Sequence, residues 1–201
     1  MGTKNNFQLE GKALPISEVK FSLYGAGINS TSGQKPYMQG TLRDVCAWMS
    51  TPRMASITRQ LRAIDDESGQ KKFKIERLPF ATFSGQFSYR KADGLIQHSG
   101  LQCFDFDHLS ADDIANARQL LLSDPYFGTE LIFTSPRGNG IKWVTHVDLS
   151  RATHEQWYSA VRAYLHSSYG LEADSAPSNV ASACFLCFDA EMVVNPDVLP
   201  F

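Results

Sequence analysis

The stretch LQCFDFDHL, residues 101–109, decides the fold expected for the rest of the chain. Side chains alternate in character from residue 102 to residue 107, which predicts a β-strand. Phe104 and Phe106 then lie on one face, and Cys103, Asp105 and Asp107 lie on the other. The phenylalanine face requires a hydrophobic core. The two carboxylates project about 7 Å apart along the strand, where they repel each other unless a cation lies between them.

This carboxylate pair predicts a divalent metal site. Mg²⁺ takes oxygen ligands, usually one or two carboxylates, and leaves its other positions to water and phosphate oxygens. An Asp-x-Asp pair also occurs as a solvated edge or turn, and that alternative stays open. The context favours a metal site, because a helix start follows directly. Ser110 can cap the first turn of this helix, and the Asp113 side chain can accept a hydrogen bond from the Ser110 backbone N–H in return. The sequence therefore predicts metal-dependent phosphate chemistry on an open sheet face.

Composition indicates one ordinary globular domain. The 201 residues are 43% hydrophobic and 20% charged, without the bias of a disordered chain. A net charge of -2 gives no overall attraction to nucleic acid, so such a partner needs a local basic patch. The chain has no apolar run of membrane-spanning length, and its first residues lack the apolar core of a signal peptide. We expect a cytoplasmic protein with no membrane partner.

The four cysteines are expected to be reduced core residues. Cys184 and Cys187 form a C-x-x-C pair, a spacing also found in zinc and redox sites. They lie in an apolar run, residues 183–188, without a second such pair or a nearby histidine pair. We therefore interpret them as buried thiols.

Periodicity and turn signals predict a mixture of strands and helices. Strands are expected at residues 19–24, 78–85, 102–107, 131–135, 141–147 and 183–188. Two helices are expected before the acidic strand, after Thr41 and after Pro52, and two beyond it, at residues 111–123 and from Thr153 to Gly170. Residues 25–40 read as a long loop, and residues 87–100 as a loop or hairpin. Helices are expected to cover the Phe104 side of the sheet, with the other face open.

A hairpin turn is predicted at Asn139 and Gly140, because both residue types tolerate positive φ. Ser135, Arg137 and Lys142 flank this turn as candidate hydrogen-bond donors to a phosphate, and glycines such as Gly138 let backbone N–H groups approach a phosphate. A simple hairpin with exposed cations is the alternative.

Cations outnumber acids between residues 53 and 77, which include Arg59 and Arg62. Arg90 and Lys91 follow in the next segment. If these side chains gather on one side, they provide a local patch for nucleic acid. A solvated helix and hairpin without a partner is the alternative.

Four segments together resemble a known family: PFATFSGQFSYR (79–90), SGLQCFDFDHL (99–109), FTSPRGNGIKW (133–143) and EADSAPSNVASACFLCFD (172–189). In this order they resemble the VirE N-terminal-like domain, a member of the archaeo-eukaryotic primase superfamily of primase-polymerases. The resemblance extends roughly over residues 21–196. It implies an α+β fold with an RRM-like palm, in which a mainly antiparallel sheet carries helices on one face. A single domain, 1–201, would comprise an N-terminal strand and loop (18–40), a helical subregion (41–77) and the palm core (78–196).

The resemblance also implies residue roles. Asp105 and Asp107 match the family's Asp-x-Asp metal ligands, and Asp174 matches the third acid, so the three would hold two Mg²⁺ or Mn²⁺ ions for strand synthesis. Ser135 and Lys142 match a Ser…His motif that contacts the nucleoside triphosphate, with lysine in place of histidine.

Two further residues depart from the family pattern. Arg137 stands where a small residue is expected, and Ser182 stands where an arginine would reach the active site. The loss of an arginine from a phosphate site costs several kcal/mol of transition-state stabilisation, so weak activity is expected. Arg137 is a candidate replacement for that charge, a hypothesis that a fully active Arg137→Ala enzyme would contradict.

The function implied is a primase-polymerase-type nucleotidyltransferase acting on single-stranded DNA with nucleoside triphosphates, in replication of a bacterial mobile element or phage. A replicative helicase is an expected partner. One alternative is a catalytically silent nucleic-acid-binding module that recruits a helicase. A DxD glycosyltransferase ranks last, because it gives no role to the hairpin or to Asp174. Since the chain ends soon after the last motif, we expect it to be part of a longer protein.

Overall fold

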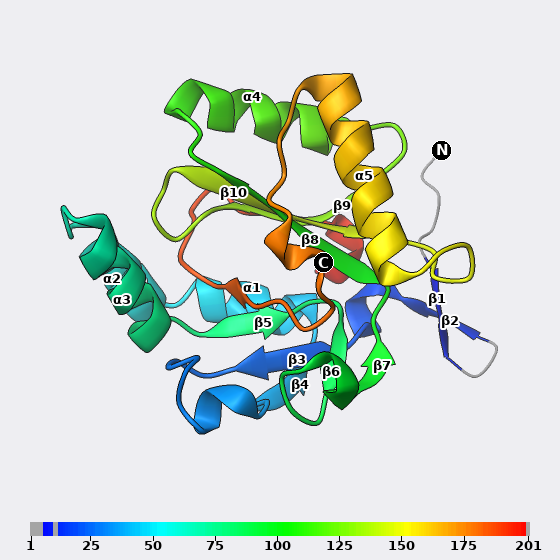
Figure 1. Ribbon diagram of the computed structural model, residues 1–201, viewed down its shortest axis with the longest axis horizontal. Helices are drawn as coiled ribbons and strands as arrows, with labels where there is room; N and C mark the ends of the chain where they lie inside the picture. The colour runs from blue at the N-terminus through cyan, green and yellow to red at the C-terminus, as the bar shows by residue number, and fades with distance from the viewer. Residues whose placement is uncertain (1–5, 10–11, 200–201) are drawn as a thin grey trace.

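The acidic strand forms as its alternation predicts. In a computed structural model of the chain, which describes residues 6–9 and 12–199, strand β8 (Leu101–Asp107) is at one edge of a four-stranded sheet (Figure 1). The other strands, in spatial order from β8, are β10 (Gly140–His146), β9 (Thr129–Thr134) and β12 (Val193–Val194). Every neighbouring pair is antiparallel. Helix α4 (Ala111–Leu122) connects β8 to β9, and these two strands lie on either side of β10.

A second antiparallel sheet occupies the lower half of Figure 1 and joins strands that are far apart in the sequence. In spatial order its strands are β11 (Cys184–Phe185), β5 (Phe80–Thr82), β3 (Phe21–Tyr24) and β4 (Met38–Gly40). Two hairpins lie beside the sheets: β1 (Asn6–Leu9) with β2 (Lys12–Pro15), and β6 (Gly85–Phe87) with β7 (Leu95–His98). The second hairpin confirms the prediction for residues 87–100. The polar start falls partly on residues 1–5 and 10–11, outside the described residues.

The two faces of the first sheet bury different cores. Phe104 and Phe106 pack against α4 and α5 (His154–Tyr169), which confirms the helices predicted on this face. On the opposite face, Phe133 and its neighbours pack against the second sheet and α1 (Leu42–Met49), and the half-buried Cys103 joins this core. The prediction that this face stays open is therefore wrong at the Cys103 end, because the second sheet covers it.

Within the described residues, three α-helices precede the acidic strand, so the prediction of two is wrong. Helices α1 and α2 (Pro52–Arg62) form as expected, and the Asp44 carboxylate accepts the Thr41 backbone N–H at 2.8 Å. The third helix is α3 (Glu67–Arg77), whose first turn is capped by Asp66 through the N–H of Gly69 at 2.6 Å. The acidic residues 65–67 thus follow the end of α2 and also begin α3. Among the described residues, no helix has both the length and the apolarity needed to cross a membrane.

Other sequence predictions need smaller corrections. Residues 25–40 are not loop throughout, because they contain β4 and a turn of 3₁₀ helix (Ser32–Gln34). The predicted strand 183–188 is reduced to the two residues of β11. Cys184 and Cys187 are buried and carry free thiols, in agreement with their assignment as core residues. The remaining 3₁₀ turns are Ile16–Glu18, Ala92–Gly94, Ala176–Ser178 and Pro196–Val198.

The hairpin between β9 and β10 forms, but for a different reason from the one predicted. Positive φ occurs at Gly138 (85°), whereas Asn139 and Gly140 have negative φ. Gly140 is required by close packing, because a Cβ atom there would collide with the backbone oxygen of Phe106 on the neighbouring strand. The glycine therefore lets β10 approach β8 where β8 ends, beside Asp107.

A buried histidine pair lies near the start of β8, at the end away from the carboxylates. His98 Nε2 and His154 Nδ1 are 3.0 Å apart in a hydrogen bond, and the Gln102 amide donates to His154 Nδ1 at 3.2 Å and to the His154 backbone oxygen at 2.6 Å. Burial lowers the pKa of both histidines to about 4, and for His98 the nearby His154 and His146 add to this effect. Both imidazoles are therefore neutral near pH 7.

This pair predicts that stability falls in mild acid. The histidines of the unfolded chain take up protons near their ordinary pKa of 6.5, whereas those of the folded chain do so only near 4. The contribution of the two histidines to the free energy of unfolding is complete above about pH 6.5 and is lost as the pH falls toward 4. The free energy of unfolding, measured in urea, should drop by about 2–4 kcal/mol over this interval. The drop should be smaller in His154→Gln and should change little in His166→Gln, where an exposed imidazole pairs with the exposed Glu172; equal pH profiles for all three proteins would contradict it.

Candidate functional site

The register of β8 and β10 places a lysine directly across from the first acid. Lys142 pairs with Asp105 in the sheet, and the Lys142 ammonium forms an ion pair with Asp105 Oδ2. Both side chains are largely buried, with 12% and 15% of their surfaces exposed. The other carboxylate oxygen of Asp105, Oδ1, is buried and has no hydrogen-bond partner in the described part of the chain. This oxygen can accept a further donor or a cation.

The third acid is held at the unpaired edge of β8 by backbone contacts. The N–H of Asp174 donates to the backbone oxygen of Asp105 at 2.8 Å. From α5, the Tyr158 hydroxyl donates to the Asp174 backbone oxygen and Arg162 Nε donates to the Ala173 backbone oxygen, each at 2.8 Å. The Asp174 side chain is exposed, and its Oδ1 accepts the N–H of Ala176 at 3.1 Å. Helix α5 and β8 together bring this carboxylate beside the Asp-x-Asp pair.

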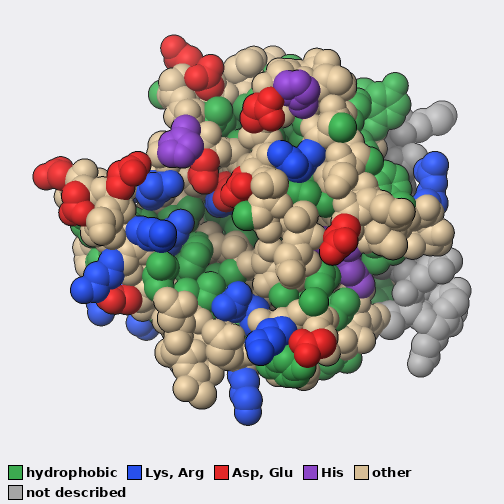
Figure 2. All heavy atoms as spheres, in the orientation of Figure 1, with side chains coloured by type: hydrophobic (Ala, Val, Ile, Leu, Met, Phe, Trp, Pro, Cys, Tyr) green, Lys and Arg blue, Asp and Glu red, His purple; other side chains and the backbone are tan. Residues whose placement is uncertain are grey.

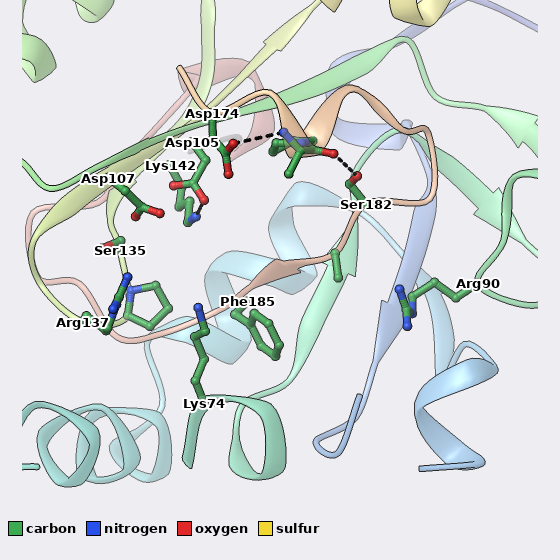
Figure 3. A pocket seen from close by; sticks show the side chains of 14 residues that line it. Lys74, Arg90, Asp105, Asp107, Ser135, Arg137, Lys142, Asp174, Ser182 and Phe185 are labelled. Carbon is green, nitrogen blue, oxygen red and sulfur yellow. Dashed lines mark hydrogen bonds and ion pairs between the residues drawn. The ribbon is translucent and has the colours of Figure 1, made fainter. Parts of the chain in front are cut away.

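The three carboxylates share a pocket of about 340 Å³ between the two sheets (Figure 3). Eight of the residues predicted for the site line this pocket: Asp105, Asp107, Asp174, Ser135, Arg137, Lys142, Ser182 and Arg90. Gly138, Lys91, Arg59 and Arg62 do not line it. The carboxylates lie along one side of the pocket, and Arg137 and Lys74 lie across from them in the close view. The space-filling view shows a hollow bordered by Lys and Arg side chains, with acidic side chains above it (Figure 2).

Lys74 and Phe185 also line the pocket, and neither was predicted as a site residue. The Lys74 ammonium lies 5.3 Å from the centroid of the Phe185 ring. Burial lowers the pKa of Lys74, and the positive charges of Lys142 and Arg137 lower it further. The excess of cations in residues 53–77 was the one sequence signal for Lys74, but it did not indicate which cation faces the site.

Around the hairpin turn, the chain presents a buried hydroxyl to the pocket. Ser135 Oγ is buried and has no hydrogen-bond partner within the described residues. The N–H of Gly138 donates to the Ser135 backbone oxygen at 2.9 Å, so it closes the turn and is not directed at a ligand. The phosphate-binding contribution predicted for this turn thus rests on the side chains of Ser135 and Arg137.

The predicted nucleic-acid-binding residues separate into three groups. Arg90 lines the pocket, and its guanidinium lies 5.7 Å from the centroid of the Phe80 ring. Arg62 binds the hairpin turn, because its Nε donates to the Pro136 backbone oxygen and its Nη2 to the Ser135 backbone oxygen, both at 3.2 Å. Arg59 and Lys91 are exposed side chains away from the pocket. A continuous basic strip that includes all four residues is not formed.

A comparison with protein families identifies the chain. The family model described as the BT4734-like, N-terminal domain matches residues 73–193. The chain belongs to this family. No curated protein and no solved structure matches it. The BT4734-like segment begins within α3, ends within β12, and contains all three carboxylates together with Lys74, Arg137 and Lys142. Arg59 and Arg62 lie before it.

The donor set of this BT4734-like site suits a hard divalent cation. Three carboxylates meet in one pocket, and the buried Oδ1 of Asp105 has a free acceptor position. Within the described residues, however, no three His, Cys, Asp or Glu side chains are close enough together to hold a metal ion as they stand. A metal would therefore require Lys142 to release Asp105 and the exposed Asp174 side chain to turn inward. The residues fit the ion chemically once these two side chains have moved.

Arg62 lies outside the BT4734-like segment and yet fixes part of its site, which leads to a second prediction. Arg62→Met removes two charge-assisted hydrogen bonds to the turn and should lower its local stability by about 1–2 kcal/mol. Hydrogen exchange of the Gly138 amide should become faster by roughly tenfold. Arg59→Met is the matched control: Arg59 is also an exposed residue of α2, but its side chain makes no hydrogen bond within the described residues, so this exchange should stay unchanged. Equal exchange rates in the two variants would show that Arg62 does not hold the turn.

Proposed function

We propose that this BT4734-like domain is a metal-dependent nucleotidyltransferase of the primase-polymerase type, which starts or extends a strand on single-stranded DNA. The observation that supports the proposal is the convergence of Asp105, Asp107 and Asp174 on one side of a pocket whose other side is cationic. Carboxylates suit the metal ions of such a reaction, and cations suit the triphosphate. The resemblance to the VirE N-terminal-like domain supports the same reading.

Each group in the pocket has a part in the proposed reaction. Mg²⁺ or Mn²⁺ bound to the three carboxylates would activate a 3′-hydroxyl and stabilise the charge that develops on the phosphates. Lys142 and Arg137 bind phosphate oxygens, and the buried Ser135 hydroxyl donates to another. Lys142 pairs with Asp105 in the structure, so it would exchange the carboxylate for a phosphate when substrate and metal bind. The protein contributes position and electrostatics and forms no covalent bond to the substrate.

The connection order of the first sheet agrees with an RRM-like palm. The chain runs β8–α4–β9–β10–α5, with β10 between β8 and β9, and the backbone at Asp174 then returns to the free edge of β8. A β-α-β-β-α-β order with helices on one face is that of the ferredoxin-like and RRM architectures. The palm is part of the proposal, together with action in the bacterial cytoplasm, in replication of a mobile element or phage, beside a replicative helicase.

Two features favour a second candidate, a catalytically silent nucleic-acid-binding module. The Lys142–Asp105 ion pair occupies an oxygen that a metal would need. Ser182 supplies no positive charge, and its hydroxyl donates to the Ala176 backbone oxygen at 3.2 Å. Arg137 lies in the same pocket and can provide the missing charge, although it also forms a 3.7 Å ion pair with the exposed Glu67.

A strand-synthesis assay distinguishes the two candidates. Single-stranded DNA, with and without a primer, is incubated with labelled ribonucleotides or deoxynucleotides and with Mg²⁺ or Mn²⁺. Wild type is compared with the double variant Asp105→Ala/Asp107→Ala and with Arg137→Ala. Metal-dependent products that disappear in the double variant would support the polymerase. No product from any protein, with DNA binding retained by the double variant, would support the silent module.

A further inference from the structure

One cation of the pocket comes from outside the motifs that predicted the site. Lys74 is on α3, near its C-terminal end, and its side chain reaches the pocket beside Phe185 (Figure 3). Lys71 and Lys72, on the same helix, are exposed, whereas Lys74 is half-buried. The helix therefore turns one of its lysines toward the site.

Lys74 differs from Lys142 and Arg137 in having no anionic partner within the described residues. Lys142 is paired with Asp105, and Arg137 lies 3.7 Å from Glu67. Within the described residues, no carboxylate forms a salt bridge with Lys74; the Asp107 charge acts on it only from a distance. A half-buried ammonium without a counter-ion is unfavourable, and the two neighbouring positive charges add repulsion. An anion bound in the pocket would relieve both effects.

The residues around Lys74 determine which anion fits. Lys74, Arg137 and Lys142 provide three positive charges near one another, and Ser135 Oγ is a buried hydroxyl with a free hydrogen-bonding position. Phosphate oxygens accept charge-assisted hydrogen bonds from such groups. Several cations spread along one side of a pocket suit a chain of linked phosphates better than a single carboxylate, because each phosphate carries its own charge. The 340 Å³ volume accommodates such a chain.

We propose that Lys74 is a substrate-binding residue, whose ammonium holds the phosphate oxygens of a polyphosphate chain together with Arg137 and Lys142. Helix α3 thereby contributes directly to the site. The identity of that substrate as a nucleoside triphosphate rests on the proposed function, whereas the polyphosphate contact does not.

Calorimetric titration of the full chain with inorganic tripolyphosphate tests this inference. The titration is carried out once with Mg²⁺ and once with EDTA, so that binding can be detected whether or not it needs a metal. Lys74→Met keeps the length of the side chain and removes its charge, and it should weaken binding about tenfold or more in the buffer where wild type binds. Lys72→Met, an exposed position on the same helix, should bind within about twofold of wild type. Lys74→Arg should retain most of the affinity. Thermal unfolding checks that all variants are folded.

The possible results separate the role of Lys74 from the proposed polymerase activity. Wild type that binds tripolyphosphate in neither buffer, or Lys74→Met that binds as wild type does, would overturn the role of Lys74. Strand synthesis by Lys74→Met with an unchanged KM for nucleotide would do the same while leaving the proposed function intact. Conversely, Lys74-dependent tripolyphosphate binding by a protein that makes no strand would support the inference and overturn the polymerase.

Discussion

Under the proposed function, Asp107→Asn is expected to lower kcat/KM for strand synthesis by about 10³-fold or more while leaving the protein folded. The loss of a ligand to a catalytic metal removes several kcal/mol of transition-state stabilisation, and each 1.36 kcal/mol is a factor of about ten in rate. Asparagine has the shape of aspartate, so packing changes little. Because the Asp107 carboxylate makes no hydrogen bond within the described residues, the free energy of unfolding should stay within about 0.5 kcal/mol of wild type.

Asp105→Asn should be as damaging to activity but should also affect stability. This change removes the partner of the largely buried Lys142 ammonium and leaves that charge uncompensated. A drop in the unfolding free energy is therefore expected for Asp105→Asn and not for Asp107→Asn. Asp112→Asn, an exposed position in the first turn of α4, is the control for both measurements. Steady-state kinetics and urea unfolding measure the two effects. Full activity in Asp107→Asn would contradict the proposed metal-dependent mechanism.

Phe104→Ala is expected to produce the largest loss of stability, about 3–5 kcal/mol. The Phe104 side chain is fully buried in the core beneath α5. Its ring stacks on Tyr158 with a centroid distance of 4.5 Å and packs against Trp143 at 5.6 Å. Alanine leaves a cavity between sheet and helix that these large rings cannot close without moving. Since domains of this size are stable by only about 5–15 kcal/mol, the midpoint of urea unfolding should fall sharply.

This change should also reach the site through Tyr158, whose hydroxyl donates to the Asp174 backbone oxygen. Loss of the stacked ring frees Tyr158 and loosens the third carboxylate, so hydrogen exchange at the Asp174 amide should increase. Ile96→Ala provides the control, because Ile96 is 69% exposed in β7. A loss below about 1 kcal/mol for Phe104→Ala would show that the core around α5 is loosely packed.

The sequence was sufficient where local signals were strong. The alternation of residues 102–107 predicted β8, and the Ser110–Asp113 and Thr153–Gln156 patterns mark where α4 and α5 begin. Helix α3 was missed because no residue of it is fully buried, so its apolar periodicity is weak, and its acidic start resembled the end of the preceding helix. Missing this helix also meant missing Lys74 as a site residue.

The second sheet could not be predicted from local patterns. Its strands β3, β5 and β11 are widely separated in the sequence, and β11 pairs with β5 over only two residues. Long-range pairing of this kind depends on the shape of the completed core. The same limit applies to Arg62, whose charge suggested nucleic acid, because its acceptors are backbone oxygens more than 70 residues away. The meeting of the three acids, in contrast, was expected from the resemblance of their motifs to a known family.

The backbone contact between Asp174 and Asp105 has a consequence for self-association. β8 is an edge strand, and an unpaired edge can recruit a strand from another molecule. The chain at Asp174 occupies this edge at its midpoint and is itself fastened by Tyr158 and Arg162. The contact that delivers the third carboxylate therefore also shields the edge, and loosening residues 171–182 would expose it to aggregation.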